Sequence, residues 1–136
     1  MKIVAITPVY NEEEVIISVL ERIKKHVDVL IISDDGSTDS TREKIEAWRQ
    51  GKQGIQVILA RRNAGASMAL KKGYALVTHL LAKRELEPED PVIEIDSDGQ
   101  HDPDYIPHLV GRYLKGHGAS IILARRALSA TLLVAQ

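Results

Sequence analysis

Two carboxylates stand one residue apart at the end of an apolar run, in the segment IEIDSDGQHDP (residues 93–103). Asp96 and Asp98 flank Ser97, and residues i and i+2 of an extended segment point to the same side. Both carboxylates can therefore reach one ion, and hard divalent cations prefer oxygen ligands. Without an ion, two close carboxylates raise each other's pKa. The residues alone leave two interpretations open: a divalent metal site, or one Asp that caps a helix beside a solvated neighbour.

The residues after this pair continue the polar turn. Gly99 permits a tight turn, and Gln100 offers one more neutral oxygen. We expect structural roles for His101 and Asp102. Asp102 precedes Pro103 and is predicted to cap the helix that begins there.

A second acidic segment, DDGSTDS, covers residues 34–40. Asp34 and Asp35 end an apolar run, and Gly36 lets the chain turn. Capping of the next helix explains residues 37–39 without any function, but it does not explain two adjacent acids. A carboxylate at this place could accept hydrogen bonds from a nucleobase or a ribose.

The segment TPVYNEE (residues 7–13) follows the first apolar run. Pro8 stiffens the turn. Tyr10 could stack on a base or fill the core. Glu12 could cap a helix or bond the edge of a base.

Basic residues follow two other apolar runs. The segment RRNAGAS (residues 61–67) offers two arginines and a candidate helix cap in Asn63, and Arg125 and Arg126 end the last run. A diphosphate would attract both arginine forks and a metal held by carboxylates.

Strands and helices alternate along the chain. Strands are predicted over residues 2–7, 28–33, 55–60, 91–96 and 119–124, and helices over 12–27, 37–51, 64–86 and 103–116. Continuous apolar strands joined by helices are typical of a parallel sheet that is covered on both faces. Ligands of such sheets bind beyond the carboxyl ends of the strands. Every polar segment above follows a strand, so we expect them all at one edge.

The composition narrows the class of protein. A chain of 136 residues predicts one domain. A net charge of −1 gives no global reason to bind nucleic acid, and the absence of cysteine excludes disulfides and thiolate metal sites. No apolar stretch reaches the roughly 20 residues of a membrane span, and we expect a soluble, cytoplasmic chain. The phosphate-binding motifs GxxxxGK[ST] and GxGxxG are absent after the first strand.

Taken in order, four segments resemble the motifs of the large inverting family 2 of glycosyltransferases. They are TPVYNEE, DDGSTD, RNAGAS followed by AL and G (62–73), and DSDGQHDP (96–103). That family contains dolichyl-phosphate mannose synthases, undecaprenyl-phosphate sugar transferases and cellulose-synthase-like enzymes. The segment DGQHDP is most similar to the polyprenyl-phosphate branch, and the resemblance covers residues 1 to 126.

The resemblance implies a GT-A fold, a Rossmann-like α/β arrangement with a mainly parallel sheet and helices on both faces. It assigns nucleotide-sugar binding to Pro8, Tyr10, Glu12, Ile32, Asp34, Asp35, Asp96 and Ser97. Asp96 and Asp98 match the family's metal-binding DXD motif, with Gln100 as a further ligand of Mg²⁺ or Mn²⁺. Asp98 and Arg125 match residues that act in the reaction.

The resemblance also implies a reaction. A sugar would pass from a GDP- or UDP-sugar to an acceptor, a polyprenyl phosphate in this branch, with inversion at the anomeric carbon. The metal would neutralise charge on the departing nucleoside diphosphate. Such an enzyme would work in cell-wall or glycan biosynthesis at the cytoplasmic membrane face, with peripheral membrane association or a homo-oligomer left open. The alternative is a nucleotide-sugar-binding module, or an inactive fragment, without the acceptor half.

We accordingly expect a donor-binding domain over residues 1–126 and an apolar tail over residues 127–136. Family members continue into an acceptor half beyond the fifth strand. The tail carries no charge and is predicted to need a partner surface that the chain does not supply.

Overall fold

The computed structural model describes residues 1–115, 121–124 and 130–133, with side chains as far as Lys115. The strands are β1 (Val4–Val9), β2 (Val29–Asp34), β3 (Ile55–Leu59), β4 (Val92–Glu94), β5 (Ile121–Ala124) and β6 (Ala130–Leu133). The helices are α1 (Ile16–Lys24), α2 (Thr41–Arg49), α3 (Ala66–Ala82) and α4 (Ile106–Lys115), and a short 3₁₀ helix, η1 (Pro103–Tyr105), precedes α4. The predicted alternation of strands and helices is confirmed.

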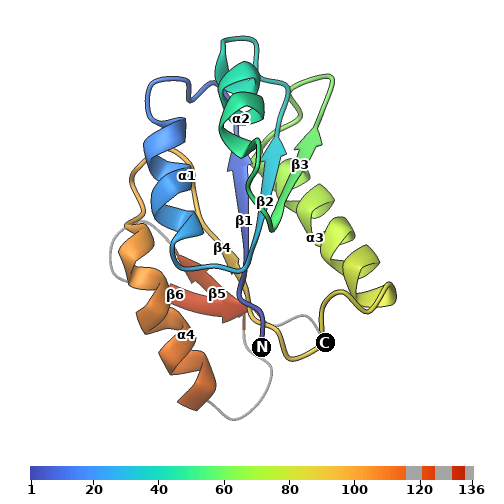
Figure 1. Cartoon of the computed structure of the whole chain (residues 1–136), viewed down its shortest axis with the longest axis vertical. Helices are drawn as coiled ribbons and strands as arrows, with labels where there is room; N and C mark the ends of the chain where they lie inside the picture. The colour runs from blue at the N-terminus through green and yellow to red at the C-terminus, as the bar shows by residue number, and fades with distance from the viewer. Residues whose placement is uncertain (116–120, 125–129, 134–136) are drawn as a thin grey trace.

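The strands form one sheet in the order β3-β2-β1-β4-β5-β6 (Figure 1). β1 to β5 run parallel, and β1 pairs with β2 on one side and with β4 on the other. The carboxyl ends of β1, β2 and β4 therefore lie side by side. This is the arrangement that the sequence predicts for its polar segments.

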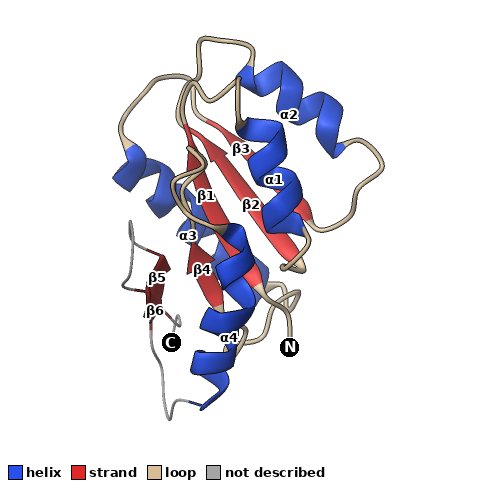
Figure 2. Cartoon of the chain, turned by 90° about the vertical axis from the view of Figure 1, so that its left-hand side faces the viewer, coloured by secondary structure: helices blue, strands red, loops and turns tan. Residues whose placement is uncertain are grey.

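Helices cover both faces of the sheet (Figure 2). The larger apolar cluster packs α1, α2 and α4 against one face, and the smaller cluster packs α3 against the other. Successive strand residues point to opposite faces, so Ala5 joins the larger cluster while Val4 and Ile6 join the smaller one. The predicted α/β fold with a covered parallel sheet is confirmed.

The first helix begins later than the sequence predicts. α1 starts at Ile16 rather than at residue 12, and its buried residues recur at the spacing of one helical face. Glu12 and Glu13 lie in the preceding turn, where the Glu13 carboxylate accepts hydrogen bonds from the backbone and hydroxyl of Ser40. The Glu13 carboxylate therefore binds the residue before α2 instead of opening α1. None of the described helices is long and apolar enough to cross a bilayer.

The apolar tail corrects one expectation. Residues 130–133 form β6, which pairs antiparallel with β5 and meets β4 at Val92↔Leu133. The partner surface of this segment is thus the chain's own sheet. The prediction failed because nothing in such a short apolar run indicates that it pairs with the strand just before it in the sequence.

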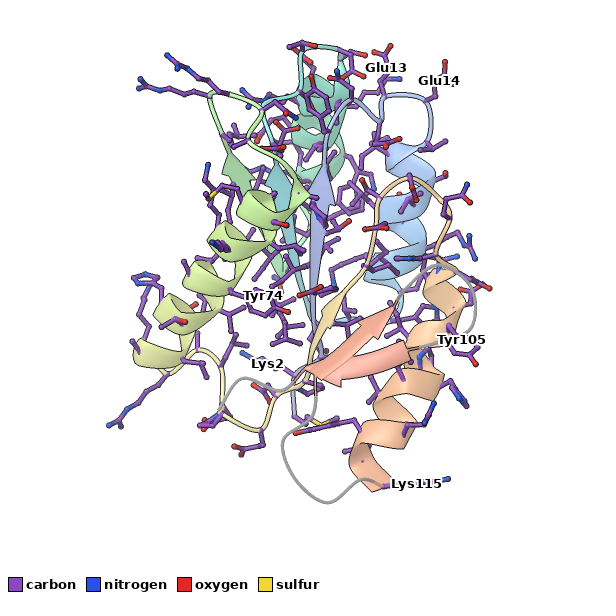
Figure 3. The ribbon with its side chains drawn as sticks, turned by 180° about the vertical axis from the view of Figure 1, so that it is seen from behind. Lys2, Glu13, Glu14, Tyr74, Tyr105 and Lys115 are labelled. Atoms are coloured by element: carbon purple, nitrogen blue, oxygen red, sulfur yellow. The ribbon has the colours of Figure 1, made fainter. Side chains whose placement is uncertain are left out.

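Two polar contacts fix helices to their neighbours. The indole Nε1 of Trp48 on α2 donates to Glu21 on α1 at 2.8 Å. The hydroxyl of Tyr74 on α3, labelled in Figure 3, donates to Glu94 on β4 at 2.5 Å. Burial and the neighbouring Glu94 raise the pKa of Tyr74, so its hydroxyl keeps the proton that it donates.

Gly73→Ala should destabilise the fold, because α3 lies very close to β1 at this point. A Cβ at position 73 would stand 2.5 Å from the Cγ2 atom of Ile6, a stiff and fully buried side chain. We expect a loss of about 1–2 kcal/mol in the free energy of unfolding, measured by urea denaturation. Gly111→Ala on α4 is the control, since no described atom lies within 4 Å of its Cβ, and it should gain up to about 1 kcal/mol. Equal effects of the two changes would contradict the close packing of α3.

Candidate functional site

A pocket of about 290 Å³ opens at the carboxyl edge of the sheet. The loops that follow β1, β2, β3 and β4 all contribute to it. Its lining residues are Pro8, Val9, Tyr10, Glu12, Asp35, Asn63, Gly65, Ala66, Asp96, Ser97 and Asp98. Glu13 and Glu14, labelled in Figure 3, lie at this same end of the molecule. The polar segments that the sequence places after separate strands thus meet around one hollow.

Hydrogen bonds between the loops hold the acidic pair at this pocket. The backbone N–H of Ile95 donates to the carbonyl of Ile6 at 3.0 Å, which extends the pairing of β4 with β1. The hydroxyl of Ser97 donates to the carbonyl of Pro8 at 2.9 Å. The Ser97 side chain therefore ties the loop after β4 to the end of β1. Asp96 and Asp98, on either side of it, line the pocket.

The pKa of Glu12 reflects the negative charge of this pocket. Burial raises the pKa of Glu12, and the nearby carboxylates of Asp98, Asp39 and Asp96 raise it further. A cation would lower this repulsion, whereas a free anion would increase it.

The donor set fits a hard divalent cation. Asp96 and Asp98 offer only oxygen atoms to one pocket, which suits Mg²⁺ or Mn²⁺. Among the described residues, no group of three or more His, Cys, Asp or Glu side chains has the geometry of a complete metal site. The remaining ligands of a bound ion would then be water or oxygen atoms of a ligand, as is usual for Mg²⁺.

Gln100 does not join the two acids in the pocket lining. It is exposed, and its backbone N–H donates to the Oδ1 atom of Asp98 at 2.9 Å. This bond closes the turn that Gly99 allows with a φ of 81°. The structure therefore gives Gln100 a role in shaping the Asp98 turn, and a metal contact by its side chain stays a prediction.

The adjacent acids of the second segment point to opposite faces of the sheet. Asp35 reaches the loop before α3, where its carboxylate accepts from the backbone N–H groups of Ala64 and Gly65 at 2.9 Å and 2.8 Å. It also accepts from the side-chain amide of Asn63 at 3.0 Å. Asn63 was predicted to cap α3, but the residue at that helix end is Gly65, with a φ of 99°. Asp35 thus lines the pocket and fixes one of its walls.

Asp34 lies on the other face, under α2. Its Oδ1 atom accepts from the backbone N–H groups of Gly36 and Ser37 and, at 2.7 Å, from Nε of Arg42. Its side chain is fully buried, and Ile32, two residues earlier on the same face, belongs to the core. Neither residue is part of the pocket lining, because the alternation of β2 directs both toward the helices.

Tyr10 resolves an alternative that the sequence left open. Its side chain is 42% exposed and lines the pocket, so it does not fill the core. An aromatic ring on a pocket wall offers a stacking surface to a planar ligand. Arg125, the other predicted contact for a phosphate, lies outside the described residues.

Sequence reasoning missed Asn11 and identified Gly36 only as a turn residue, although both join the loops. Asn11 adopts a φ of 49°, and its side-chain oxygen accepts from the backbone N–H of Thr38 at 2.8 Å. Gly36 approaches the loop after β3 so closely that a Cβ would stand 2.5 Å from the carbonyl carbon of Arg62. The available signals were the Asn and Gly in turns, since these residue types tolerate positive φ.

Asp35→Ala should destabilise the fold by about 2–4 kcal/mol, because it leaves three hydrogen-bond donors of residues 63–65 without their acceptor. Urea denaturation measures the loss. Asp35→Asn keeps one carbonyl oxygen and should lie between this variant and the wild type. The exposed Glu14→Ala is the control and should change stability by less than about 0.5 kcal/mol. A loss as small as that of the control would show that Asp35 does not support the loop.

Glu12→Gln should stabilise the metal-free chain slightly at pH 7. A raised pKa means that the folded state binds the Glu12 proton more tightly than the unfolded state, so wild-type stability falls as pH rises through this pKa. The gain should be a few tenths of a kcal/mol, because solvent screens a partly exposed group. It should vanish below the ordinary Glu pKa of 4.5. Thermal melts of both proteins at pH 7 and pH 4 test this, and a less stable variant at pH 7 would contradict it.

Comparison with known proteins identifies a family and similar solved structures. Residues 4–131 match glycosyl transferase family 2. The crystal structure of S. aureus TarS superimposes with a TM-score of 0.62 at 23% identity, covering 90% of this chain and 21% of that chain. The structure of S. aureus TarS 1-349 in complex with UDP superimposes with a TM-score of 0.61 at 25% identity, covering 90% of this chain and 34% of that chain.

The present chain thus spans about a fifth to a third of the length of the proteins that it matches. Its α/β sheet corresponds to the Rossmann-like GT-A fold of these glycosyltransferase structures. The match covers nearly all of the sequence, including every loop that lines the pocket. The chain belongs to glycosyl transferase family 2.

Proposed function

We propose that the pocket binds the nucleoside diphosphate of a sugar donor, and that the chain supplies the donor-binding part of a metal-dependent, inverting glycosyltransferase. One observation carries the proposal: Asp96 and Asp98 line the same pocket as the exposed ring of Tyr10. Such a pocket offers a planar surface at one place and a site for a cation at another. The UDP bound by the relative TarS 1-349 has parts suited to both.

Tyr10 and its neighbours would hold the nucleoside. Stacking of a base on an aromatic side chain contributes about 1–3 kcal/mol. Pro8 and Val9 add apolar wall, and Glu12 offers oxygens to base or ribose donors. Asp34 and Ile32, which the family resemblance also assigns to the nucleotide, would act by shaping the turn beneath the pocket.

The charge of the pocket makes nucleotide binding depend on a cation. Glu12, Asp35, Asp96 and Asp98 all line it, and these acids would repel a diphosphate that arrives alone. Asp96 and Asp98 would hold Mg²⁺ or Mn²⁺. When bound, that ion would supply Lewis-acid stabilisation of the departing nucleoside diphosphate. Arg125, which ends the segment IILAR, would add positive charge near the diphosphate or the acceptor phosphate.

The acceptor in this proposal is a polyprenyl phosphate, reached at the cytoplasmic face of a membrane. Its support is the segment DGQHDP, which resembles the polyprenyl-phosphate branch of the family. A phosphate acceptor is already anionic and can attack the anomeric carbon with little help from a general base. Residues 1–126 would form the donor-binding domain, and the acceptor side would come from outside them.

Calorimetric titration of the chain with UDP and with GDP, each with and without Mn²⁺, tests the proposal. We expect Mn²⁺-dependent binding of one nucleotide, because the ion cancels the repulsion between the diphosphate and the pocket acids. Asp96→Asn or Asp98→Asn should weaken that binding at least about tenfold, which corresponds to about 1.4 kcal/mol. The nucleotide that binds would also narrow the class of sugar donor.

Glu89→Gln is the matched control, since it removes an exposed acid from the loop that precedes β4, at the opposite end of that strand. It should leave the affinity unchanged. Nucleotide binding that is equally strong without Mn²⁺, or unchanged in both Asp variants, would refute the proposed site. Binding without sugar transfer to a polyprenyl phosphate would favour the nucleotide-sugar-binding module.

A further inference from the structure

His101 is a buried histidine beside the acidic pair, and the proposed nucleotide contacts do not involve it. Its side chain is only 7% exposed. The Nδ1 atom of the ring accepts a hydrogen bond from the backbone N–H of Asp96 at 3.0 Å. A ring nitrogen that accepts carries no proton, so the neutral imidazole of His101 has its proton on Nε2.

The Nε2 atom of His101 faces the carboxylate of Asp96. It lies 3.6 Å from the Oδ2 atom of Asp96, just beyond hydrogen-bond distance. Nε2 is fully buried and has no hydrogen-bond partner among the described residues. A buried donor without an acceptor is unfavourable, so a small rotation of the half-exposed Asp96 side chain toward Nε2 would stabilise the pair.

The backbone around His101 is anchored on its far side. Arg22 on α1 bridges Asp102 at 2.5 Å and Asp104 at 3.2 Å. Pro103, buried at the start of η1, stiffens the same stretch. The imidazole is therefore attached to a fixed segment. Its Nδ1 atom faces the backbone N–H of Asp96, and its Nε2 atom faces the carboxylate of Asp96.

We propose that His101 is a positioning residue, whose Nε2–H group holds one oxygen of Asp96 so that the other points into the pocket. This inference rests on the proposed function of Asp96. The ring's contact with the backbone N–H sets the loop, and its contact with the carboxylate sets the direction of the ligand oxygen. Groups that orient a metal-binding side chain in this way commonly change metal affinity 10- to 100-fold when they are removed.

Nitrogen-15 NMR of the His101 imidazole in the wild-type chain, at neutral pH and without nucleotide, tests the geometry directly. We expect a protonated Nε2, an unprotonated Nδ1 and slow exchange of the Nε2 proton with solvent. Asp96→Ala should shift the Nε2 resonance more than the Nδ1 resonance, because it removes the carboxylate and keeps the backbone N–H. A proton on Nδ1, or an unchanged Nε2 resonance in the variant, would overturn the inference.

Two substitutions then separate the two contacts. His101→Asn places an amide oxygen near the Nδ1 position, so it can still accept from Asp96 but cannot reach its carboxylate. His101→Gln places an amide N–H near the Nε2 position and loses the acceptor. We expect His101→Asn to weaken Mn²⁺-dependent nucleotide binding about tenfold with little change in melting temperature. His101→Gln should melt lower but keep more of the affinity.

If His101 were purely structural, the variant with the lower melting temperature would also bind the nucleotide more weakly. His101→Gln would then lose more affinity than His101→Asn. That order, or wild-type affinity in both variants, would also overturn the inference. His79→Asn, on the exposed surface of α3, is the control and should leave affinity unchanged. If the wild-type chain binds neither UDP nor GDP with Mn²⁺, the proposed function fails, and the NMR experiment alone decides the role of His101.

Discussion

The pairing of β1 with both β2 and β4 is the constraint on which the rest of the structure depends. Because these strands run parallel, their carboxyl ends and the loops that follow them share one edge. Residues that lie more than 80 positions apart, such as Pro8 and Ser97, then meet through a hydrogen bond of 2.9 Å. No single loop contains the pocket, and a change in the register of either pair would separate its walls.

The alternation of strand residues divides the acids of this edge into two kinds. Asp34 and Asp35 are both buried, and their carboxylates accept hydrogen bonds from backbone N–H groups and from the side chains of Arg42 and Asn63. They hold the walls of the pocket together. Asp96 and Asp98 follow a strand end that is fixed through Ser97, and Asp96 is half exposed. These two acids line the pocket, where a ligand can reach their carboxylates.

The sequence predicts the fold better than it predicts the role of each acid. Strand–helix alternation and continuous apolar strands were sufficient for the parallel sheet, because both patterns arise from burial on two faces. The side of the sheet on which Asp34 lies depends on the register of β2, and a slip of one residue reverses it. Glu13 illustrates the same limit: its partner, Ser40, lies 27 positions away, so nothing local distinguishes this contact from the expected role at the start of α1.

The arrangement that would give this pocket its affinity also weakens the free protein. Burial and the neighbouring acids raise the pKa of Glu12, which means that its charge is unfavourable in the folded chain at neutral pH. Natural proteins depart from locally favourable choices mainly where function requires it. A cation between Asp96 and Asp98 would convert the repulsion into attraction, and any ligand that binds only the folded state stabilises that state. In the proposed function, the acidic edge carries the negative half of an ion pair, and the cation that accompanies the sugar donor supplies the positive half.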